Sequence, residues 1–228
     1  MGINKHIFQY QALHLVLLLV LLSIVTLYVS SNPQILLGSY WKISATTWFC
    51  LAIAVPIAHQ TYVMLVWRFE LYQRTFTKRW GISKAFKYYT IGFSTLFSAR
   101  LISIILVAMS TQHSWDISPT TAYTAAAIIT PFVLYLFYSV KTYFTIARAY
   151  GIDHFDPHYN KPYVKQGIFK YTDNGMYIFG LMILYLPSLL LFSKAALLAA
   201  IFNHVYIWVH FYCTEKPDMI KIYGKAAS

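Results

Sequence analysis

The chain has few charged residues, and this scarcity decides its class. Asp, Glu, Lys and Arg make up 11% of its 228 residues, whereas about 25% is usual in soluble domains. Hydrophobic residues make up 58%. So few charges leave too little polar surface for a water-soluble globule, which excludes the common soluble fold classes and indicates a chain surrounded by lipid.

Cysteine is also scarce, because only Cys50 and Cys213 occur. They fall near opposite ends of their predicted membrane segments, which is too far apart for a disulfide. Metal-ligating residue types gather once, at Asp153, His154, Asp156 and His158. That run lies in a loop containing Gly and Pro and has no regular ligand spacing, so we predict no metal site.

Long apolar runs are what the chain has in abundance. About 20 apolar residues in a helix cross the hydrocarbon core of a bilayer. Six segments qualify: Leu13–Val29, Thr47–Trp67, Tyr88–Met109, Tyr123–Val140, Met176–Phe192 and Ala195–Cys213. We therefore predict an all-α, polytopic integral membrane bundle of about six transmembrane helices in a single domain, residues 1–228. The last two segments are so close that they must form a helical hairpin.

The distribution of the 18 Lys and Arg residues predicts the orientation. If the N-terminus is cytoplasmic, fifteen of them fall on the cytoplasmic side, Lys42 and Lys194 fall outside, and Arg100 lies within a span. This asymmetry follows the positive-inside rule and places both termini in the cytoplasm. The bilayer thus accounts for the net charge of +11, and we expect no nucleic-acid partner. The membrane would be a bacterial inner membrane or the endoplasmic reticulum.

Two long cytoplasmic connections, Arg68–Lys87 and Lys141–Gly175, mix aromatic and cationic side chains. This mixture is typical of interfacial segments, so we expect both to lie along the inner headgroups. Function in such proteins usually resides in connections of this kind.

Arg100 lies near the centre of the third segment, where a charge costs at least about 2.5–3.5 kcal/mol. It could bind an anionic lipid headgroup, and it could equally snorkel or pair with backbone carbonyls. We expect most other polar residues at depth to form hydrogen bonds between helices. Among them His210, toward the cytoplasmic end, is the best candidate for a site. The others are His59, Gln60, Asn203 and His204.

Two sequence elements in the C-terminal part stand on either side of the predicted hairpin: VKQGIFKYTDNGMYIFG (Val164–Gly180) and TEKPDMIKIYG (Thr214–Gly224). From Tyr163 onward the chain resembles the membrane methyltransferase superfamily that includes phosphatidylethanolamine N-methyltransferases and isoprenylcysteine carboxyl methyltransferases. In that superfamily G-x-[FY]-[RK]-Y-x-[RD]-[HN]-P-x-Y precedes two hydrophobic helices and E-E-P-x-[LM]-x-x-x-[YF]-G follows them. The matching residues are Gly167, Phe169, Lys170, Tyr171, Asp173, Asn174, Met176, Tyr177, Glu215, Pro217, Met219, Tyr223 and Gly224.

The resemblance favours the phospholipid branch, because that branch has D-N-P-M-Y where this chain has DNGMY, whereas the isoprenylcysteine branch has Arg-His-Pro. Gly175 replaces the family's Pro, and Lys216 replaces the second Glu of E-E-P. The resemblance implies an S-adenosylmethionine-dependent methyltransferase that acts on the amine of phosphatidylethanolamine or its partly methylated derivatives, with residues 163–228 as its cofactor-binding part.

Several alternatives remain open. They are an isoprenylcysteine-type or other small-lipid methyltransferase and a non-catalytic membrane relative. A membrane reductase using a nicotinamide cofactor is disfavoured because no dinucleotide-type Gly-rich loop occurs. A transporter would require a polar pathway through several helices, which only three segments offer.

The resemblance also implies roles for individual residues. Those implied to bind the cofactor are Gly167, Tyr171, Asn174, Gly175, Met176, Tyr177, Glu215 and Lys216. The candidates for catalysis are Asn174, Glu215 and His210. The candidates for holding the lipid phosphate, which a guanidinium binds with two hydrogen bonds, are Arg100, Arg74 and Arg79. Methyl transfer is a displacement that needs positioning rather than a metal. The base that deprotonates the amine stays unassigned, with Asp173, Glu215, His210 and His154 as candidates.

Overall fold

The computed structural model describes residues 6–159, 162 and 164–224, and within them the chain is almost wholly helical. The long helices are α2 (Gln11–Ser31), α3 (Ala45–Gln73), α4 (Thr77–Ser110), α5 (Pro119–Ser139) and α9 (Lys194–His210). The short helices and single turns are η1 (Pro33–Leu36), η2 (Val140–Phe144), α6 (Ile146–Ala149), η3 (Ile152–His154), η4 (Gly167–Lys170), α7 (Gly175–Ile178), η5 (Gly180–Tyr185), α8 (Leu186–Leu191), η6 (Phe211–Glu215) and α10 (Lys216–Tyr223). The two strands, β1 (Ser39–Tyr40) and β2 (Ile43–Ser44), pair antiparallel.

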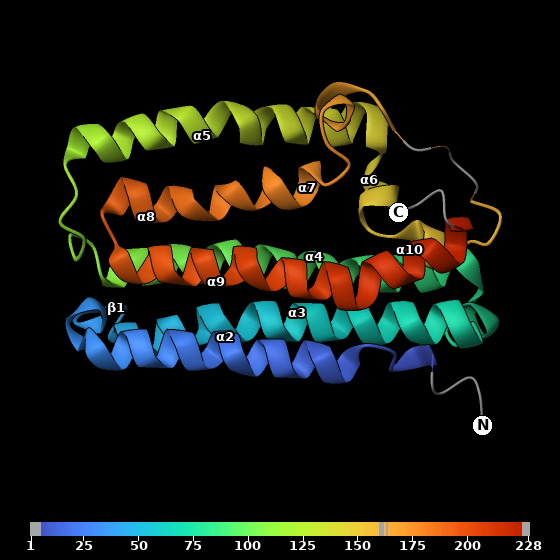
Figure 1. Ribbon diagram of the computed structural model, residues 1–228, viewed down its shortest axis with the longest axis horizontal. Helices are drawn as coiled ribbons and strands as arrows, with labels where there is room; N and C mark the ends of the chain where they lie inside the picture. The colour runs from blue at the N-terminus through green and yellow to red at the C-terminus, as the bar shows by residue number, and fades with distance from the viewer. Residues whose placement is uncertain (1–5, 160–161, 163, 225–228) are drawn as a thin grey trace.

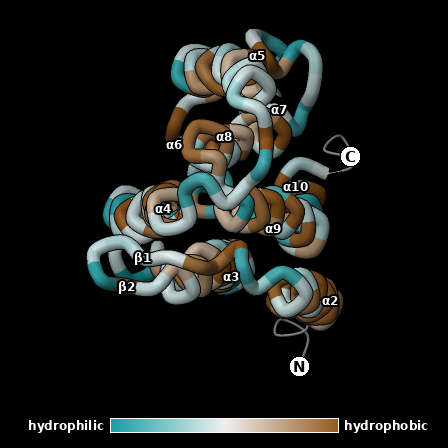
Figure 2. The backbone as a smooth tube through the Cα atoms, turned by 90° about the vertical axis from the view of Figure 1, so that its left-hand side faces the viewer, coloured by the Kyte–Doolittle hydropathy of each residue, from teal (hydrophilic) through white to brown (hydrophobic). Residues whose placement is uncertain are grey.

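The long helices run side by side along the longest axis of the molecule, and the start of α2 and the end of α10 lie at the same end (Figure 1). Seen end-on, α2 and α3 lie below α4 and α9, and the chain from α5 to α8 lies above them (Figure 2). Among the described residues, the helices long and apolar enough to cross a membrane are Gln11–Ser31, Ala45–Gln73, Thr77–Ser110, Pro119–Phe144 and Lys194–Tyr223. The predicted all-α membrane bundle is confirmed.

The segment predicted at Met176–Phe192 is broken rather than continuous. It consists of α7, the 3₁₀ turn η5 and α8, which together form a shorter apolar stretch, Gly175–Leu191. Gly180 lies at one junction and Pro187 follows the other, and neither residue supports the interior of a regular helix. The predicted hairpin follows directly, because Phe192 adopts a left-handed conformation and the hydroxyl of Ser193 caps α9 by accepting a hydrogen bond from Ala196 N.

The connection Arg68–Lys87, expected to lie along the inner headgroups, is mostly helical. Helix α3 continues to Gln73, and α4 begins at Thr77 and is kinked at Gly81, where the backbone is not helical. The buried carboxylate of Glu70 accepts hydrogen bonds from the backbone N–H groups of Phe76 and Thr77, which closes the turn. The second connection is made of η2, α6, η3 and η4, short turns that cover the end of the bundle where α10 ends.

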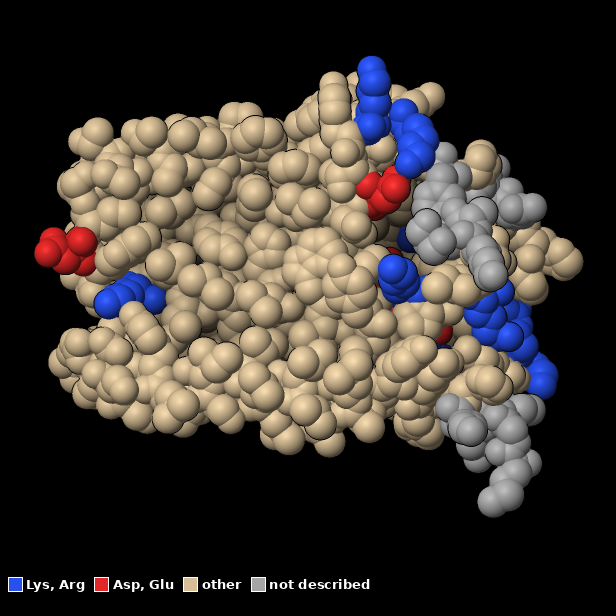
Figure 3. Space-filling view, in the orientation of Figure 1, with Lys and Arg blue, Asp and Glu red and all other residues tan. Residues whose placement is uncertain are grey.

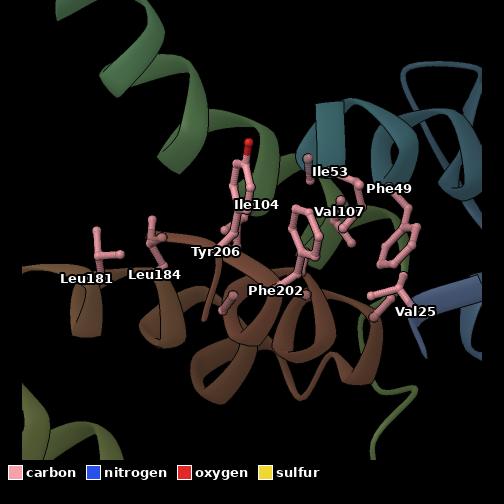
Figure 4. Packing of buried hydrophobic residues seen from close by; sticks show 14 of the residues in the cluster. Val25, Phe49, Ile53, Ile104, Val107, Leu181, Leu184, Phe202 and Tyr206 are labelled. Atoms are coloured by element: carbon pink, nitrogen blue, oxygen red, sulfur yellow. The ribbon is translucent and has the colours of Figure 1, made fainter. Parts of the chain in front are cut away.

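The core is centred on α9. Phe202 and Tyr206 of α9 pack against residues of α3 and α4, including Ile53 and Ile104 (Figure 4). The alanines of α9 are fully buried and allow neighbouring helices to approach closely. By contrast, α2 buries only His14 and Val25, and its remaining apolar surface is available to lipid.

A buried ion pair joins α3 to α10. Arg68 of α3 and Asp218 of α10 are both fully buried, and Nε of Arg68 lies 2.6 Å from Oδ1 of Asp218. The remaining guanidinium nitrogens donate to the carbonyls of His6 at 2.8 Å and Thr214 at 3.1 Å. Because a buried charge without partners is costly, this pair fixes α10 and the N-terminal residues against α3.

Replacing Asp218 by Asn tests this role. The change keeps the shape of the side chain but leaves the Arg68 charge buried and unbalanced, so we expect a loss of about 3–5 kcal/mol in the free energy of unfolding. Unfolding of the detergent-solubilised chain measures it. The exposed Arg79→Ala variant serves as the control and should change stability by less than about 0.5 kcal/mol. An Asp218→Asn loss as small as that of the control would contradict the structural role.

Candidate functional site

A cavity of about 670 Å³ is lined by residues of α10 and of the short turns that cover the end of the bundle where α10 ends, and by Arg100 deeper between the helices. Its size suits a small-molecule site. Its walls come from α3, α4, α5 and α9 and from the turns that cover them. It reaches the surface at Lys165 and Asp173, whose exposed side chains form an ion pair of 2.6 Å. Figure 3 shows that most visible Lys and Arg residues gather at this end of the molecule.

Arg100 lies at the inner end of the cavity. It is buried on α4, where Nε donates to Oδ1 of Asn203 at 2.9 Å and Nη1 lies 3.5 Å from Nδ1 of His59. Asn203 is itself anchored, because its amide donates to the carbonyls of Ala52 and Ala199. Arg100 forms no ion pair with any of the described residues. The inner end therefore carries a positive charge that only neutral groups of the described chain contact.

Another wall is formed by the turn from α9 into α10. After His210 the chain passes through a π-helical turn, η6, which ends at Glu215. The hydroxyl of Tyr177 donates to Oε2 of Glu215, and both residues line the cavity. Tyr177 belongs to the first sequence element and Glu215 to the second. The hairpin thus joins the two elements in one cavity wall, as the sequence predicts for two segments on the same side of the membrane.

His210 also lines the cavity and is buried on α9. Neither ring nitrogen has a hydrogen-bond partner among the described residues. Its ring lies near those of His14 and Trp67, with centroids 6.1 and 6.2 Å away. An imidazole in this position is available to a ligand.

The loop around η3 supplies a wall that the sequence alone did not reveal. Gly151 adopts φ +78°, and a Cβ atom there would lie 2.5 Å from Cζ2 of Trp67, so glycine permits a close approach to α3. Asp153 follows in the cavity wall, with Oδ2 accepting a hydrogen bond of 2.6 Å from the hydroxyl of Tyr223. Burial raises the pKa of Asp153, while the Tyr223 hydrogen bond and the charge of Arg148 act in the opposite direction.

The structure brings most of the sequence-predicted site residues together. Those lining the cavity are Arg100, Asn174, Met176, Tyr177, His210, Glu215 and Lys216. Those outside its lining are Arg74, Arg79, Gly167, Tyr171 and Gly175. The side chain of Tyr171 is 76% exposed. Arg74 donates to the Phe155 carbonyl at 2.7 Å, and Arg79 lies over the ring of Trp80. A Cβ atom at Gly167 would meet Oγ of Ser139, so this glycine allows η4 to pack on α5.

The comparison with known proteins addresses the C-terminal half. Residues 119–226 match the phospholipid methyltransferase family. The resemblance inferred from the two sequence elements is thereby confirmed. The match extends further toward the N-terminus than those elements and includes all of α5, whereas α2, α3 and α4 lie before it. No curated protein and no solved structure matches the chain significantly.

The phospholipid methyltransferase match indicates methyl transfer as the chemistry and a lipid as the acceptor. The apolar helices agree with an integral membrane protein. The cavity, however, is not built from the matched residues alone, because His59, Trp67 and Arg100 line it from α3 and α4. The sequence signal for Arg100 was its charge within an apolar run. The signal for Asp153 was its place in the run of Asp and His residues considered as a metal site, which did not indicate a place in this cavity. Arg148 carried no comparable signal, because charged residues are ordinary in a polar loop.

Replacing Gly151 by Ala tests the close approach of the η3 loop to α3. The left-handed conformation costs a non-glycine residue about 1–2 kcal/mol, and the overlap with Trp67 adds about 1–3 kcal/mol. Thermal unfolding in detergent measures the sum. In a Trp67→Leu background the overlap is removed, so the Gly151→Ala change should cost at least about 1 kcal/mol less than in the native chain. Equal costs in both backgrounds would contradict the close packing.

Proposed function

We propose that this chain transfers the methyl group of S-adenosylmethionine to the amine of phosphatidylethanolamine or its partly methylated derivatives. The observation that best supports the proposal is the composition of one cavity wall. Tyr177 and Asn174 from the first family element and Glu215 and Lys216 from the second all line the same space. That space also reaches Arg100 between the membrane helices. A water-soluble cofactor and a lipid could therefore meet there.

The residues present suit the cofactor, which carries a sulfonium, an ammonium and a carboxylate group. Glu215 offers a half-buried carboxylate for a cationic group, and Lys216 offers a cation for the carboxylate. The ring of Tyr177 can favour a sulfonium through cation–π contact. When bound, the cofactor supplies an electrophilic methyl group. Met176 and Asn174 complete the wall. Gly167 and Gly175 would contribute by shaping the turns, and Tyr171 would have to act from the cavity's rim.

The lipid is assigned to the part of the cavity between α4 and α5. Phe93 and Phe97 of α4 and Phe137 of α5 line it and suit acyl chains. Arg100 has no carboxylate partner in the described chain and would bind the phosphate, a pairing that the guanidinium favours. Arg74 and Arg79 would act at most on headgroups outside the cavity.

In this proposal, catalysis depends mainly on how the chain positions the amine relative to the methyl group. The chain must hold an amine about 3–3.5 Å from the methyl group and exclude competing nucleophiles. Asn174 and His210 would orient the reacting groups by hydrogen bonds, since each lines the cavity. Glu215 acts as a cofactor ligand, and its bond with Tyr177 fixes its direction.

Expression in a host that makes phosphatidylethanolamine but not phosphatidylcholine tests the proposal. Lipid mass spectrometry should reveal mono-, di- or trimethylated ethanolamine lipids. Glu215→Ala and Asn174→Ala variants should reduce them by at least about tenfold, which corresponds to the loss of one charge-assisted hydrogen bond. The Asp156→Asn variant, whose side chain lies outside the cavity lining, serves as the matched control.

The outcomes separate the alternatives. An unchanged lipid profile from a folded chain that binds S-adenosylmethionine would reassign the methyl acceptor, with isoprenylcysteine-type substrates tested next. A folded chain that binds no cofactor would be a non-catalytic relative.

Replacing Tyr177 by Phe tests the hydrogen bond that connects the two sequence elements. The change removes the hydroxyl that directs Glu215, so we expect the affinity for S-adenosylmethionine to fall about tenfold. Equilibrium binding to the purified chain measures it. The lipid-facing Tyr135→Phe variant, outside the cavity lining, should bind as the native chain does. Undiminished cofactor affinity in Tyr177→Phe would remove this pair from the site.

A further inference from the structure

Asp153 has an unsatisfied oxygen in the cavity wall. Its residue surface is 6% exposed, it lines the cavity, and Oδ2 is occupied by the hydroxyl of Tyr223. Oδ1 is buried and has no hydrogen-bond partner among the described residues. Leaving a buried carboxylate oxygen without a donor is costly. The hydrogen-bond donor that best satisfies such a carboxylate oxygen is a cationic N–H group.

The position of Asp153 is held from several sides. Gly151 places the loop against Trp67, and the ring of His154 stacks on Trp67 with centroids 4.1 Å apart. Tyr223 reaches Asp153 from α10, the helix that follows Glu215. Asp153 and Glu215 therefore line one cavity from two elements that Tyr223 links. A carboxylate held in this way is preorganised for a ligand rather than free to follow it.

The other candidate acceptors of the amine proton are less well placed. His154 has no place in the cavity lining and lies 3.5 Å from Oδ2 of Asp218. Asp173 is ion-paired with Lys165 in the exposed mouth. Glu215 is assigned to the cofactor in the proposed function, and Tyr177 holds its Oε2. His210 as a proton acceptor is an uncharged imidazole, so it offers a bound ammonium ion no negative charge.

We propose that Asp153 binds the ammonium group of the lipid substrate and accepts its proton. The inference rests on the proposed function and names the base that the sequence left unassigned. In the step, an N–H bond of the ammonium breaks, its electron pair stays on nitrogen, and an O–H bond forms on Oδ1 of Asp153. The nitrogen lone pair is then free to attack. The proton later passes to water at the mouth of the cavity, near Lys165.

The surroundings of Asp153 suit this role. Arg148 faces it from α6, Tyr223 from α10, Glu215 from η6 and His154 from its own turn. The α3 side contributes the uncharged ring of Trp67 and the cation Arg74, which donates to the carbonyls of His154 and Phe155 in the same loop. Burial raises the pKa of Asp153, and Tyr223, Arg148 and His154 act against that shift. A carboxylate with a raised pKa is a better proton acceptor near neutral pH than a surface aspartate.

The first experiment measures lipid binding without the cofactor. Purified full-length chain in detergent is titrated at pH 7 with phosphatidylethanolamine and, separately, with phosphatidylglycerol, which lacks the amine. Asp153→Asn should weaken binding of phosphatidylethanolamine about tenfold and change binding of phosphatidylglycerol less than twofold, because only the first lipid carries the cation. Asp156→Asn, in the same loop but outside the cavity lining, should leave both unchanged.

The second experiment measures methyl transfer against pH with saturating S-adenosylmethionine. For the native chain kcat/KM should rise with pH as Asp153 ionises. Asp153→Asn should lower kcat about 10²–10⁴-fold at pH 7, retain cofactor affinity within about threefold, and recover at alkaline pH, where the amine loses its proton unaided. Asp153→Glu should restore part of the rate, because it restores a carboxylate.

The outcomes decide between the two proposals. An Asp153→Asn variant with native rates and native preference for phosphatidylethanolamine overturns the role of Asp153, as does a variant that loses both lipids equally. A native chain that methylates no amine lipid overturns the proposed function. Amine binding that still depends on Asp153 in such a chain would support amine recognition by this residue without the chemistry.

Discussion

The buried guanidinium of Arg68 ties together parts of the chain that are far apart in sequence. It contacts the N-terminal residues through the carbonyl of His6, the turn before Glu215 through the carbonyls of Cys213 and Thr214, and α10 through Asp218. A charge buried away from water is tolerated only when polar or charged partners surround it. The positions of the cavity walls depend on these contacts, because η6 carries Glu215 and α10 carries Tyr223.

Charge is distributed unevenly along the cavity. Its inner end holds Arg100, which only the neutral groups of His59 and Asn203 contact among the described residues. Its outer part holds the carboxylates of Asp153, Asp173 and Glu215 beside the cations Arg148, Lys165 and Lys216. In the proposed function, the phosphate of a zwitterionic headgroup would lie toward Arg100 and its ammonium group toward the carboxylates. In a low-dielectric cavity such charge pairing selects ligands more strongly than it does at an exposed surface.

How much of the structure the sequence predicts depends on how far apart in the chain the interacting residues lie. Hydrophobic length predicts the spans, and local motifs predict that Tyr177 and Glu215 share a site, because both act over short stretches of sequence. The break at Gly180 and the continuation of α3 to Gln73 depend on packing and end-capping, which hydropathy does not report. The roles of Arg68 and Asp153 depend on partners 150 and 70 residues away. No local pattern marks Arg68, and the run that contains Asp153 indicates metal-ligating residue types rather than a place in this cavity, so only the folded chain identifies both roles.

The cavity straddles the boundary of the family match. The matched residues 119–226 supply the hairpin, both sequence elements and the η3 loop, but α3 and α4 close the inner end. The matched residues therefore form only part of the cavity, and α3 and α4 supply His59 and Arg100 at its inner end. Exchanging α3 and α4 for other helices would replace the inner end of the cavity while keeping the two sequence elements that line its outer part.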